Sequence, residues 1–304
     1  MENEKIINIL NRICSENQKD IFGNNHIIYV SNIKVQIQQS QKIVVIKNYE
    51  KWYTLDMIDI HCHILPDVDD GSRNMEMSME MISTAYDSGV RSMIATPHCY
   101  PGLFENYASG ELQQRWDELY HAVHAAGIPM HLYQGMEIMA FDNLAVYLQK
   151  GKVWTLNGTA YFLVEFSFDE DPLYCKKILS SGVAAGYIPV VAHPARYFFV
   201  QNNPSLVYEW YMMGCGIQLN KDSLLGRHGR RAFETGNSLL RHNLVSCVSS
   251  DAHGTATRTT DLDEVRGFLV SEYSEEYAYM LLEENPLRIL QGKNLVGYSP
   301  RPYE

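Results

Sequence analysis

Met57-Ile58-Asp59-Ile60-His61-Cys62-His63-Ile64-Leu65-Pro66-Asp67-Val68-Asp69-Asp70-Gly71 begins as an apolar segment and ends in two histidines and a cluster of carboxylates. Successive side chains of an extended strand point to opposite faces, so His61 and His63 share one face and can offer two imidazoles to one cation. Three aspartates follow, at positions Asp67, Asp69 and Asp70. A loop there can turn their oxygens toward the same cation. The alternative is a pair of structural histidines on a barrel strand.

Downstream of Met57, short apolar runs alternate with longer amphipathic ones, which is typical of repeated β-α units. We predict seven strands, over residues 57–61, 92–96, 130–136, 161–165, 188–192, 214–219 and 244–249. Helices are expected between them and include residues 76–88, 111–126 and 173–185, each followed by a glycine. The expected fold is α/β, a distorted (β/α)7 TIM-like barrel formed by residues 57–304.

The first 56 residues are of a different kind, rich in Asn, Gln, Ile and Lys and without a recognisable motif. We predict a short helix over residues 1–18 and a small sheet with strands at 26–30, 34–38 and 42–47. This region is either a small accessory domain or upstream sequence joined to a protein that begins at Met57. Its role stays open.

Composition limits the classes of function. The chain has 304 residues and a formal net charge of −11, which argues against a surface that binds a nucleic-acid backbone. It contains no apolar run long enough to cross a bilayer, and its N-terminus lacks the apolar core of a signal peptide, so we expect a cytoplasmic protein. The six cysteines are scattered without the spacing of a zinc ribbon or a disulfide framework. We expect them to be reduced core residues.

The ends of the predicted strands carry candidate ligands. Active sites of parallel barrels are assembled at the carboxyl ends of the strands, so side chains placed there should converge. The candidates are His61, His63, His98, Glu137, Glu165, His193, Asn220, Asp251 and His253. One histidine at a strand end is more often structural, but chance placement at nearly all seven ends is hard to accept.

Histidines mixed with carboxylates favour divalent ions such as Mn²⁺, Fe²⁺, Zn²⁺ or Co²⁺. The candidates exceed what one ion needs, so two or three ions are expected, with Glu137 and Glu165 as candidates for bridging. Such a cluster activates water and holds the oxygens of an in-line displacement. Phosphoester hydrolysis is the natural use of this chemistry.

Six short segments together resemble the polymerase and histidinol phosphatase (PHP) superfamily. Within it, their spacing and the Val68–Gly71 turn look like the bacterial manganese-dependent tyrosine phosphatases of the CpsB/CapC type, which are linked to capsule and exopolysaccharide synthesis. The resemblance extends over residues 57–297. The segments are Asp59–His63, Thr96–His98, Gly135–Ile138, Val164–Phe166, Ala192–Tyr197 and Ser250–His253.

The resemblance implies three metal positions. The first would be held by His61, His63, Glu137 and Asp251. The second would be held by Asp69, His98 and His253, although Asp67 and Asp70 lie close enough in sequence to compete with Asp69. The third would be completed by Glu165 and His193, with Glu137 bridging back to the first.

Two arginines and an aromatic loop are candidates for substrate contacts. Arg196 and Arg258 can pair with phosphate oxygens in two-pronged geometry, whereas the alternative for Arg258 is an ion pair with Asp261 or Asp263. Tyr100 and Phe104 can form an aromatic wall for a phosphotyrosine ring, and ordinary loop packing explains them equally well. His253 or a metal-bound water can protonate the leaving group.

The resemblance also implies a reaction and a partner. A metal-activated water would hydrolyse protein phosphotyrosine, on a bacterial tyrosine autokinase of polysaccharide export. The alternatives are a histidinol-phosphate or other small phosphomonoester phosphatase, a metal-dependent nuclease, and a scaffold without turnover. Thiol catalysis is disfavoured, since Val68 and Glu105 stand where an arginine six residues after Cys62 or Cys99 would be needed. The sequence does not reveal the oligomeric state, and a homo-oligomer is compatible with it.

Overall fold

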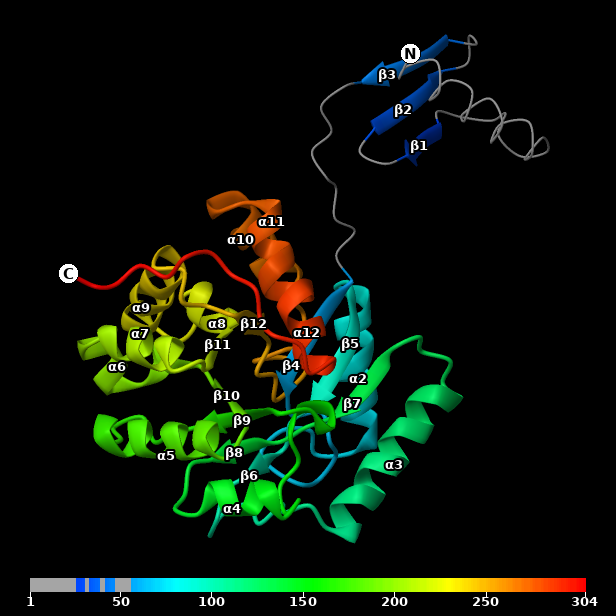
Figure 1. Cartoon of the computed structure of the whole chain (residues 1–304). Helices are drawn as coiled ribbons and strands as arrows, with labels where there is room; N and C mark the ends of the chain where they lie inside the picture. The colour runs from blue at the N-terminus through cyan, green and yellow to red at the C-terminus, as the bar shows by residue number, and fades with distance from the viewer. Residues whose placement is uncertain (1–25, 31–32, 39–41, 47–55) are drawn as a thin grey trace. The chain divides into compact units, whose positions relative to one another are not determined.

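The computed structural model describes residues 26–30, 33–38, 42–46 and 56–304. The chain divides into two compact units, Met1–Tyr53 and Thr54–Glu304. In the first, β1 (His26–Val30), β2 (Ile33–Gln38) and β3 (Lys42–Ile46) form an antiparallel sheet in that order (Figure 1). These strands agree with the predicted ones to within one residue. The predicted helix over residues 1–18 lies outside the described residues.

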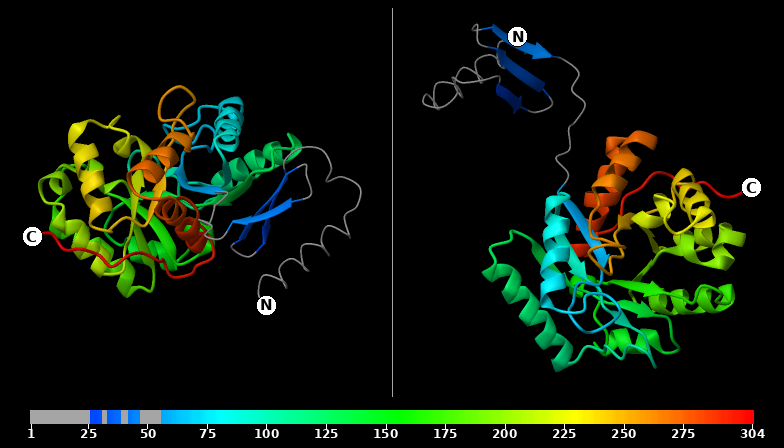
Figure 2. Two further views of the ribbon diagram at one scale, coloured as in Figure 1. Left: turned by 90° about the horizontal axis from the view of Figure 1, so that it is seen from above. Right: turned by 180° about the vertical axis from the view of Figure 1, so that it is seen from behind.

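The second unit is built on two parallel sheets, whose strands are surrounded by helices (Figures 1 and 2). The three-stranded sheet has the order β4 (Met57–Cys62), β5 (Val90–Ala95), β7 (His131–Gln134). The six-stranded sheet has the order β12 (Cys247–Ser249), β11 (Gly216–Asn220), β10 (Ile188–Val191), β9 (Tyr161–Glu165), β8 (Glu137–Met139), β6 (His98–Cys99). An isolated parallel bridge between Cys62 and Ala252 joins the end of β4 to the segment after β12. The α/β class is therefore confirmed, with a curled parallel sheet.

Two of the predicted strands, 92–96 and 130–136, are each followed, after a break of two residues, by a further short strand that was not predicted. The chain leaves β5 at Thr96 and Pro97 before β6, and leaves β7 at Gly135 and Met136 before β8. Hydrogen bonds across the break continue the pairing, from Gly135 N to Ala95 O at 3.0 Å and from Glu137 N to Pro97 O at 3.1 Å. A Cβ on Gly135 would lie 2.6 Å from Ile94 Cγ2, so the close approach requires glycine. The break places His98 and Glu137 side by side.

Helices cover the sheets, and their ends follow local sequence signals. The longer ones are α2 (Met75–Asp87), α3 (Gly110–Ala125), α5 (Pro172–Ala184), α7 (Ser205–Met212), α9 (Arg230–Arg241) and α10 (Asp263–Glu272). The shorter ones are α4 (Leu144–Gln149), α6 (Phe198–Asn202), α8 (Lys221–Leu224), α11 (Glu275–Tyr279) and α12 (Asn285–Leu290). Asn74, Ser109 and Asp171 cap α2, α3 and α5 with side-chain oxygens, as expected for N-cap residues. These three helices were predicted to within one residue.

The cysteines belong to the core. Among the described residues, Cys62, Cys99, Cys175, Cys215 and Cys247 are buried and free, and Cys14 lies outside that range. Burial raises the pKa of Cys62 and takes that of Cys99 to about 12, so neither forms the thiolate that a thiol phosphatase needs. None of the helices in the described part of the chain has both the length and the apolar content to span a bilayer.

Candidate metal centre

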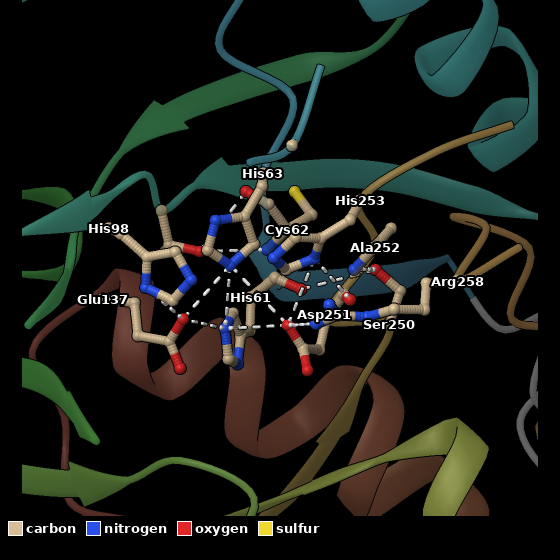
Figure 3. Close-up of polar contacts among 12 residues, drawn as sticks. His61, Cys62, His63, His98, Glu137, Ser250, Asp251, Ala252, His253 and Arg258 are labelled. Atoms are coloured by element: carbon tan, nitrogen blue, oxygen red, sulfur yellow. Dashed lines mark hydrogen bonds and ion pairs between the residues drawn. The ribbon is translucent and has the colours of Figure 1, made fainter. Parts of the chain in front are cut away.

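The candidate ligands converge at the carboxyl ends of the parallel strands. His61 and His63 come from the end of β4, and their Nε2 atoms lie 3.4 Å apart. Figure 3 shows the side chains of His61, His63, His98 and Glu137 pointing toward one another. Asp251 and His253 follow β12, and the bridge at Ala252 brings them beside β4. Residues nearly 200 positions apart in sequence thus share one site.

The ligand atoms fall into three groups, within each of which all atoms lie within 4.8 Å of one another. Glu137 belongs to two groups, since its Oε2 lies 3.0 Å from His61 Nε2 and 3.2 Å from His98 Nδ1. His193 adjoins these groups, with Nε2 2.9 Å from Glu137 Oε1 and 3.7 Å from Glu165 Oε2. The groups are His61, His63, Glu137 and Asp251; His63, Asp70, His98 and His253; and His98, Glu137 and Glu165.

The carboxylate of the second group differs from the expected one. Asp69 Oδ2 accepts from His63 Nδ1 at 2.8 Å and from the backbone N of His98 at 2.9 Å, and its Oδ1 accepts from the backbone N of Gly71 at 2.9 Å, so both oxygens are already engaged. Asp70 instead lies with Oδ1 3.3 Å from His253 Nε2 and 3.5 Å from His98 Nε2. This geometry favours Asp70 over Asp69 as the carboxylate of the second group. Asp67 lies elsewhere, with its carboxylate 3.7 Å from Arg115.

The hydrogen-bond partners of the histidines fix which nitrogen of each imidazole faces the cluster. Nδ1 of His61 lies 3.1 Å from Gln218 Oε1, and Nδ1 of His63 lies 2.8 Å from Asp69 Oδ2. Because these oxygens accept a hydrogen bond from Nδ1–H, Nε2 of each ring is the nitrogen that faces the site. His253 is held in the same way, since its Nδ1 lies 3.0 Å from the backbone O of Asp251.

Gln218 is a residue that the sequence analysis missed. Its Oε1 also accepts from the backbone N of His193 at 3.1 Å, so one buried amide orients two strand ends. Replacing Gln218 with methionine should weaken Mn²⁺ binding by roughly 10–100-fold, because His61 Nδ1 and the backbone N of His193 both lose their hydrogen-bond acceptor. Isothermal titration of the full chain measures this loss. Gln114→Met on the exposed face of α3 is the control, and equal affinities for the two variants would contradict the assignment.

Asp251 is held by a buried network beneath the cluster. Asp59 accepts from the backbone N of Ser250 at 3.1 Å and from its Oγ at 2.5 Å. The backbone N of Asp251 donates to His61 O at 2.8 Å, and Asn220 Nδ2 donates to Asp251 Oδ2 at 2.5 Å. With a φ of 49°, Asp251 has left-handed backbone, which is unfavourable for a non-glycine residue. The surrounding contacts thus impose the position of this carboxylate.

Gly71 sets the path of the loop that carries Asp69 and Asp70. A Cβ at this position would lie 2.3 Å from His63 O and 2.4 Å from His63 Cβ, so the backbones touch. Gly71→Ala should therefore destabilise the protein by about 1–3 kcal/mol and weaken Mn²⁺ binding, because the loop must move away from His63. Gly110→Ala is the matched control, since a Cβ there meets nothing within 4 Å. Thermal unfolding that is the same in both variants would contradict this role.

The donor set fits divalent metal ions. His98 Nδ1 and Glu165 Oε1 lie 2.9 Å apart, yet both are buried and neither has a hydrogen-bond partner in the described structure. His253 Nε2 is likewise buried without such a partner. Atoms that converge in this way without hydrogen bonding to one another are arranged as the ligands of a metal ion would be. Imidazole and carboxylate donors without thiolate suit Mn²⁺, Fe²⁺, Zn²⁺ and Co²⁺.

Burial and neighbouring charges shift the pKa values of several candidate ligands. Burial favours the protonated form of Asp251, but His61 and Arg258 outweigh it and hold the pKa of Asp251 well below its usual range. Burial and the neighbouring His63 lower the pKa of His253 to about 4. Burial also favours neutral His98, but the carboxylate of Glu137 outweighs it and the pKa rises to about 8. Asp251 is thus ionised and His253 neutral near pH 7, whereas His98 is largely protonated and must lose a proton before it can bind a metal ion.

The ligand groups form the floor of a cavity of about 380 Å³. Arg196 and Arg258 stand at its wall, each with one guanidinium nitrogen on Asp251, at 3.1 and 2.8 Å. The alternative pairing of Arg258 with Asp261 or Asp263 is not seen; Asp263 pairs with Arg266. The two arginines are therefore beside the cluster, as expected of residues that contact phosphate.

Aromatic side chains line the mouth of this cavity. Tyr100 and Phe104 are both present, and the Phe104 ring stacks on His98 with centroids 5.7 Å apart. Phe168, which the sequence analysis missed, lies in the loop after β9 and is 39% exposed. Its ring lies under the guanidinium of Arg196, 4.8 Å from Cζ. The cavity therefore joins an anion-binding wall to apolar faces on different loops.

Several known proteins are similar to this chain in sequence and in fold. Residues 57–291 match the family described as "Capsular polysaccharide synthesis, CpsB/CapC". The chain is 36% identical over 246 residues to "Tyrosine-protein phosphatase YwqE" of Bacillus subtilis, covering 81% of this chain and 96% of that protein. It is 31% identical over 240 residues to "Tyrosine-protein phosphatase CpsB" of Streptococcus agalactiae, covering 77% and 98%.

Solved structures agree with the sequence comparison. A structure from "Crystal structures of YwqE from Bacillus subtilis and CpsB from Streptococcus pneumoniae, unique metal-dependent tyrosine phosphatases" matches with a TM-score of 0.77 and 36% identity. The match covers 82% of this chain and all of that one. Dihydropyrimidinase from Brevibacillus agri matches with a TM-score of 0.50 at 11% identity, a likeness of fold alone.

Proposed function

Since the chain belongs to the capsular polysaccharide synthesis family CpsB/CapC, we propose that it is a metal-dependent phosphatase that hydrolyses phosphotyrosine on proteins. The observation that carries the proposal is the arrangement in one cavity of three ligand groups, two arginines and aromatic walls. Each of these fits a phosphotyrosine: ions and guanidinium groups can bind the phosphate, and apolar faces can contact the ring.

Divalent ions bound at the three groups would supply an activated water and neutralise charge on the phosphate oxygens. The residues we propose to hold them are His61, His63, Asp70, His98, Glu137, Glu165, His193, Asp251 and His253. Manganese, and two or three ions per chain, are our proposals for the metal and its stoichiometry. Glu137 supports this number, because its two oxygens face different histidines.

The two arginines would hold the phosphate during displacement. Arg196 and Arg258 approach Asp251 from the cavity wall, so their remaining N–H groups can donate to non-bridging oxygens as negative charge develops. Phe168 lies against the guanidinium of Arg196 and restricts its position. Phe104 and Phe168 come from separate loops and offer two apolar faces to the ring of the leaving group.

Hydrolysis of phosphotyrosine needs little help from a residue that protonates the leaving group. A phenol has a pKa near 10, so phenolate leaves with little assistance. His253 was one candidate proton donor, but its Nε2 lies in the second ligand group and its Nδ1 is engaged by Asp251 O. We therefore propose His253 as a ligand rather than as the acid.

The partner and the wider organisation are also proposals. A phosphorylated tyrosine kinase of polysaccharide export is the substrate that we favour, and the family description supports it. A cytoplasmic location and a possible homo-oligomer stay predictions. We further propose that the two sheets are parts of one interrupted (β/α)7 barrel, because β5 leads into β6 and β7 into β8 across breaks of two residues.

A comparison of substrates tests the proposed function. With Mn²⁺ present, the full chain should hydrolyse a phosphotyrosine peptide at least about tenfold faster than histidinol phosphate, since only the peptide presents an aromatic ring bonded to the phosphate oxygen. Single-stranded DNA at physiological salt should remain intact. Faster turnover of histidinol phosphate would favour the small-molecule phosphatase, and degradation of the DNA would favour the nuclease.

We also propose that residues 57–304 carry the activity. The matched family region begins at Met57, and the compact unit Thr54–Glu304 contains every proposed ligand. A chain that begins at Met57 should keep kcat within about twofold, because no proposed contact comes from the preceding residues. Steady-state kinetics on a phosphotyrosine peptide checks this, and complete loss of turnover would refute it.

A further inference from the structure

The segment from His253 to Asp261 leads from the metal centre toward α10, and we call it the Arg258 segment. It carries Arg258, one of the two arginines proposed to hold the phosphate. The backbone N of His253 donates to Arg258 O at 2.9 Å, so the segment turns back beside the metal centre. Arg258 Nη2 donates to Asp251 Oδ1 at 2.8 Å (Figure 3). The position of the guanidinium therefore depends on how this segment is held.

The backbone of Arg258 is in an unfavourable conformation. Its φ is 48°, in the left-handed region that residues with a Cβ rarely adopt. A residue keeps such a conformation only where its surroundings impose it. On the side of α2, Thr260 Oγ1 donates to Met81 O at 2.5 Å. A second hold comes from the opposite side of the segment.

Lys221 supplies this second hold. Its Nζ donates to Thr259 Oγ1 at 3.1 Å and to Asp261 O at 2.6 Å, on residues that closely follow Arg258. The lysine is only 2% exposed. Burial of an ammonium group costs free energy that its hydrogen bonds must offset, and both of these bonds go to the Arg258 segment. The buried charge is therefore used to hold this segment.

The end of β11 also holds the carboxylate that pairs with Arg258. Asn220 is the last residue of β11, and its Nδ2 donates to Asp251 Oδ2 at 2.5 Å. Lys221 follows directly as the first residue of α8. Two adjacent residues therefore hold Asp251 and the segment that carries Arg258, so the end of β11 sets the place of both members of this ion pair.

Building on the proposed function, we propose that Lys221 is a positioning residue, which holds the Arg258 segment so that the guanidinium of Arg258 meets the phosphate. Lys221 does not line the cavity of the metal centre, so it acts through Arg258 and not by contact with the substrate. A misplacement of about 1 Å in a group that acts on the reacting atoms can lower the rate by about 10²-fold.

Replacing Lys221 with methionine tests this role, because methionine keeps an unbranched apolar side chain and removes the donors. On a phosphotyrosine peptide with Mn²⁺, kcat should fall by roughly 10–100-fold, because Arg258 is no longer held in place. KM and the metal content by elemental analysis should each change by less than about twofold. Loss of metal together with kcat would overturn the proposal, since Lys221 would then support the ligands and not the arginine.

A double variant distinguishes positioning from general support of the fold. Arg258→Ala alone should lower kcat by about 10²–10³-fold. Adding Lys221→Met to Arg258→Ala should lower kcat by less than about twofold further, because the group that Lys221 positions is already absent. If the two losses multiply instead, Lys221 acts independently of Arg258 and the proposal is overturned.

Two threonines provide a test that leaves the buried lysine in place. Thr259→Val removes one acceptor of Lys221 and should lower kcat by about fivefold, the effect of one hydrogen bond. Thr257→Val is the matched control, since it makes the same change at an exposed position of the same segment and should leave kcat unchanged. Equal kcat for the two threonine variants would overturn the proposal, even if Lys221→Met did not fold.

The unaltered full chain separates this proposal from the proposed function. Absence of turnover of the phosphotyrosine peptide in the unaltered chain with Mn²⁺ would refute the proposed function, and the positioning role with it. Where the unaltered chain turns the peptide over, the variants at Lys221, Thr259 and Arg258 decide on the positioning role alone.

Discussion

Replacing Glu137 with glutamine should lower kcat on a phosphotyrosine peptide by about 10³-fold or more. Glu137 is buried and shared by two ligand groups, and its two oxygens approach three imidazoles within 3.1 Å: His61, His63 and His193. Glutamine keeps the shape but removes the charge and one acceptor, so an ion bound between the two groups would lose their common ligand. Metal ions contribute several kcal/mol of transition-state stabilisation, and about 4 kcal/mol corresponds to this loss.

Measuring the bound metal distinguishes the loss of a metal ligand in Glu137→Gln from unfolding of the variant. Glu137→Gln should keep its circular dichroism spectrum and lose at least one equivalent of bound Mn²⁺ by elemental analysis. Glu118→Gln on α3, where the carboxylate is 43% exposed, is the control and should change neither quantity. A Glu137→Gln variant with normal metal content and normal turnover would show that the ligand groups are misassigned.

Replacing Arg196 with alanine should lower kcat by about 10²–10³-fold and leave the metal content unchanged. The guanidinium stands at the wall beside Asp251 and above Phe168, where it can donate to phosphate oxygens as charge develops on them. Loss of one preorganised donor to a developing oxyanion typically has an effect of this size. Steady-state kinetics and elemental analysis on the same preparation measure both quantities.

Two further variants make this test specific. Arg196→Lys should recover only part of the rate, because an ammonium group is a point charge and cannot give the two-pronged contact of a guanidinium. Arg230→Ala, on an arginine that is 88% exposed on α9, should leave kcat unchanged. If Arg196→Ala also loses metal, the arginine acts mainly by holding Asp251, and its role at the phosphate would be rejected.

The sequence predicted the elements of this unit well because their signals are local. The apolar strand before His61 and the glycines after α2, α3 and α5 define their boundaries without knowledge of the fold. Strand alternation also predicted correctly that His61 and His63 share a face and that Cys62 does not, since Cys62 Sγ contacts Ile94 O at 3.2 Å. The convergence of strand ends followed from the topology of parallel sheets.

The details that the sequence did not predict depend on contacts between distant segments. Which aspartate enters the cluster is decided by the packing of Gly71 on His63, which turns Asp69 toward an imidazole and Asp70 into the site. The interruptions of β5 and β7 likewise depend on how Gly135 packs on Ile94. The position of Gln218 could have been predicted, because it lies two residues before Asn220 on β11 and therefore shares a face with it. Phe168 follows no pattern that distinguishes it from other loop aromatics.

Chelation and restoration of activity test the central claim most directly. Treatment with a strong chelator should abolish turnover of a phosphotyrosine peptide, and added Mn²⁺ should restore it. A thiol alkylator should have little effect on the folded protein, because Cys62, Cys99, Cys175, Cys215 and Cys247 are all buried. Full activity after exhaustive chelation, with no metal left by elemental analysis, would contradict the account.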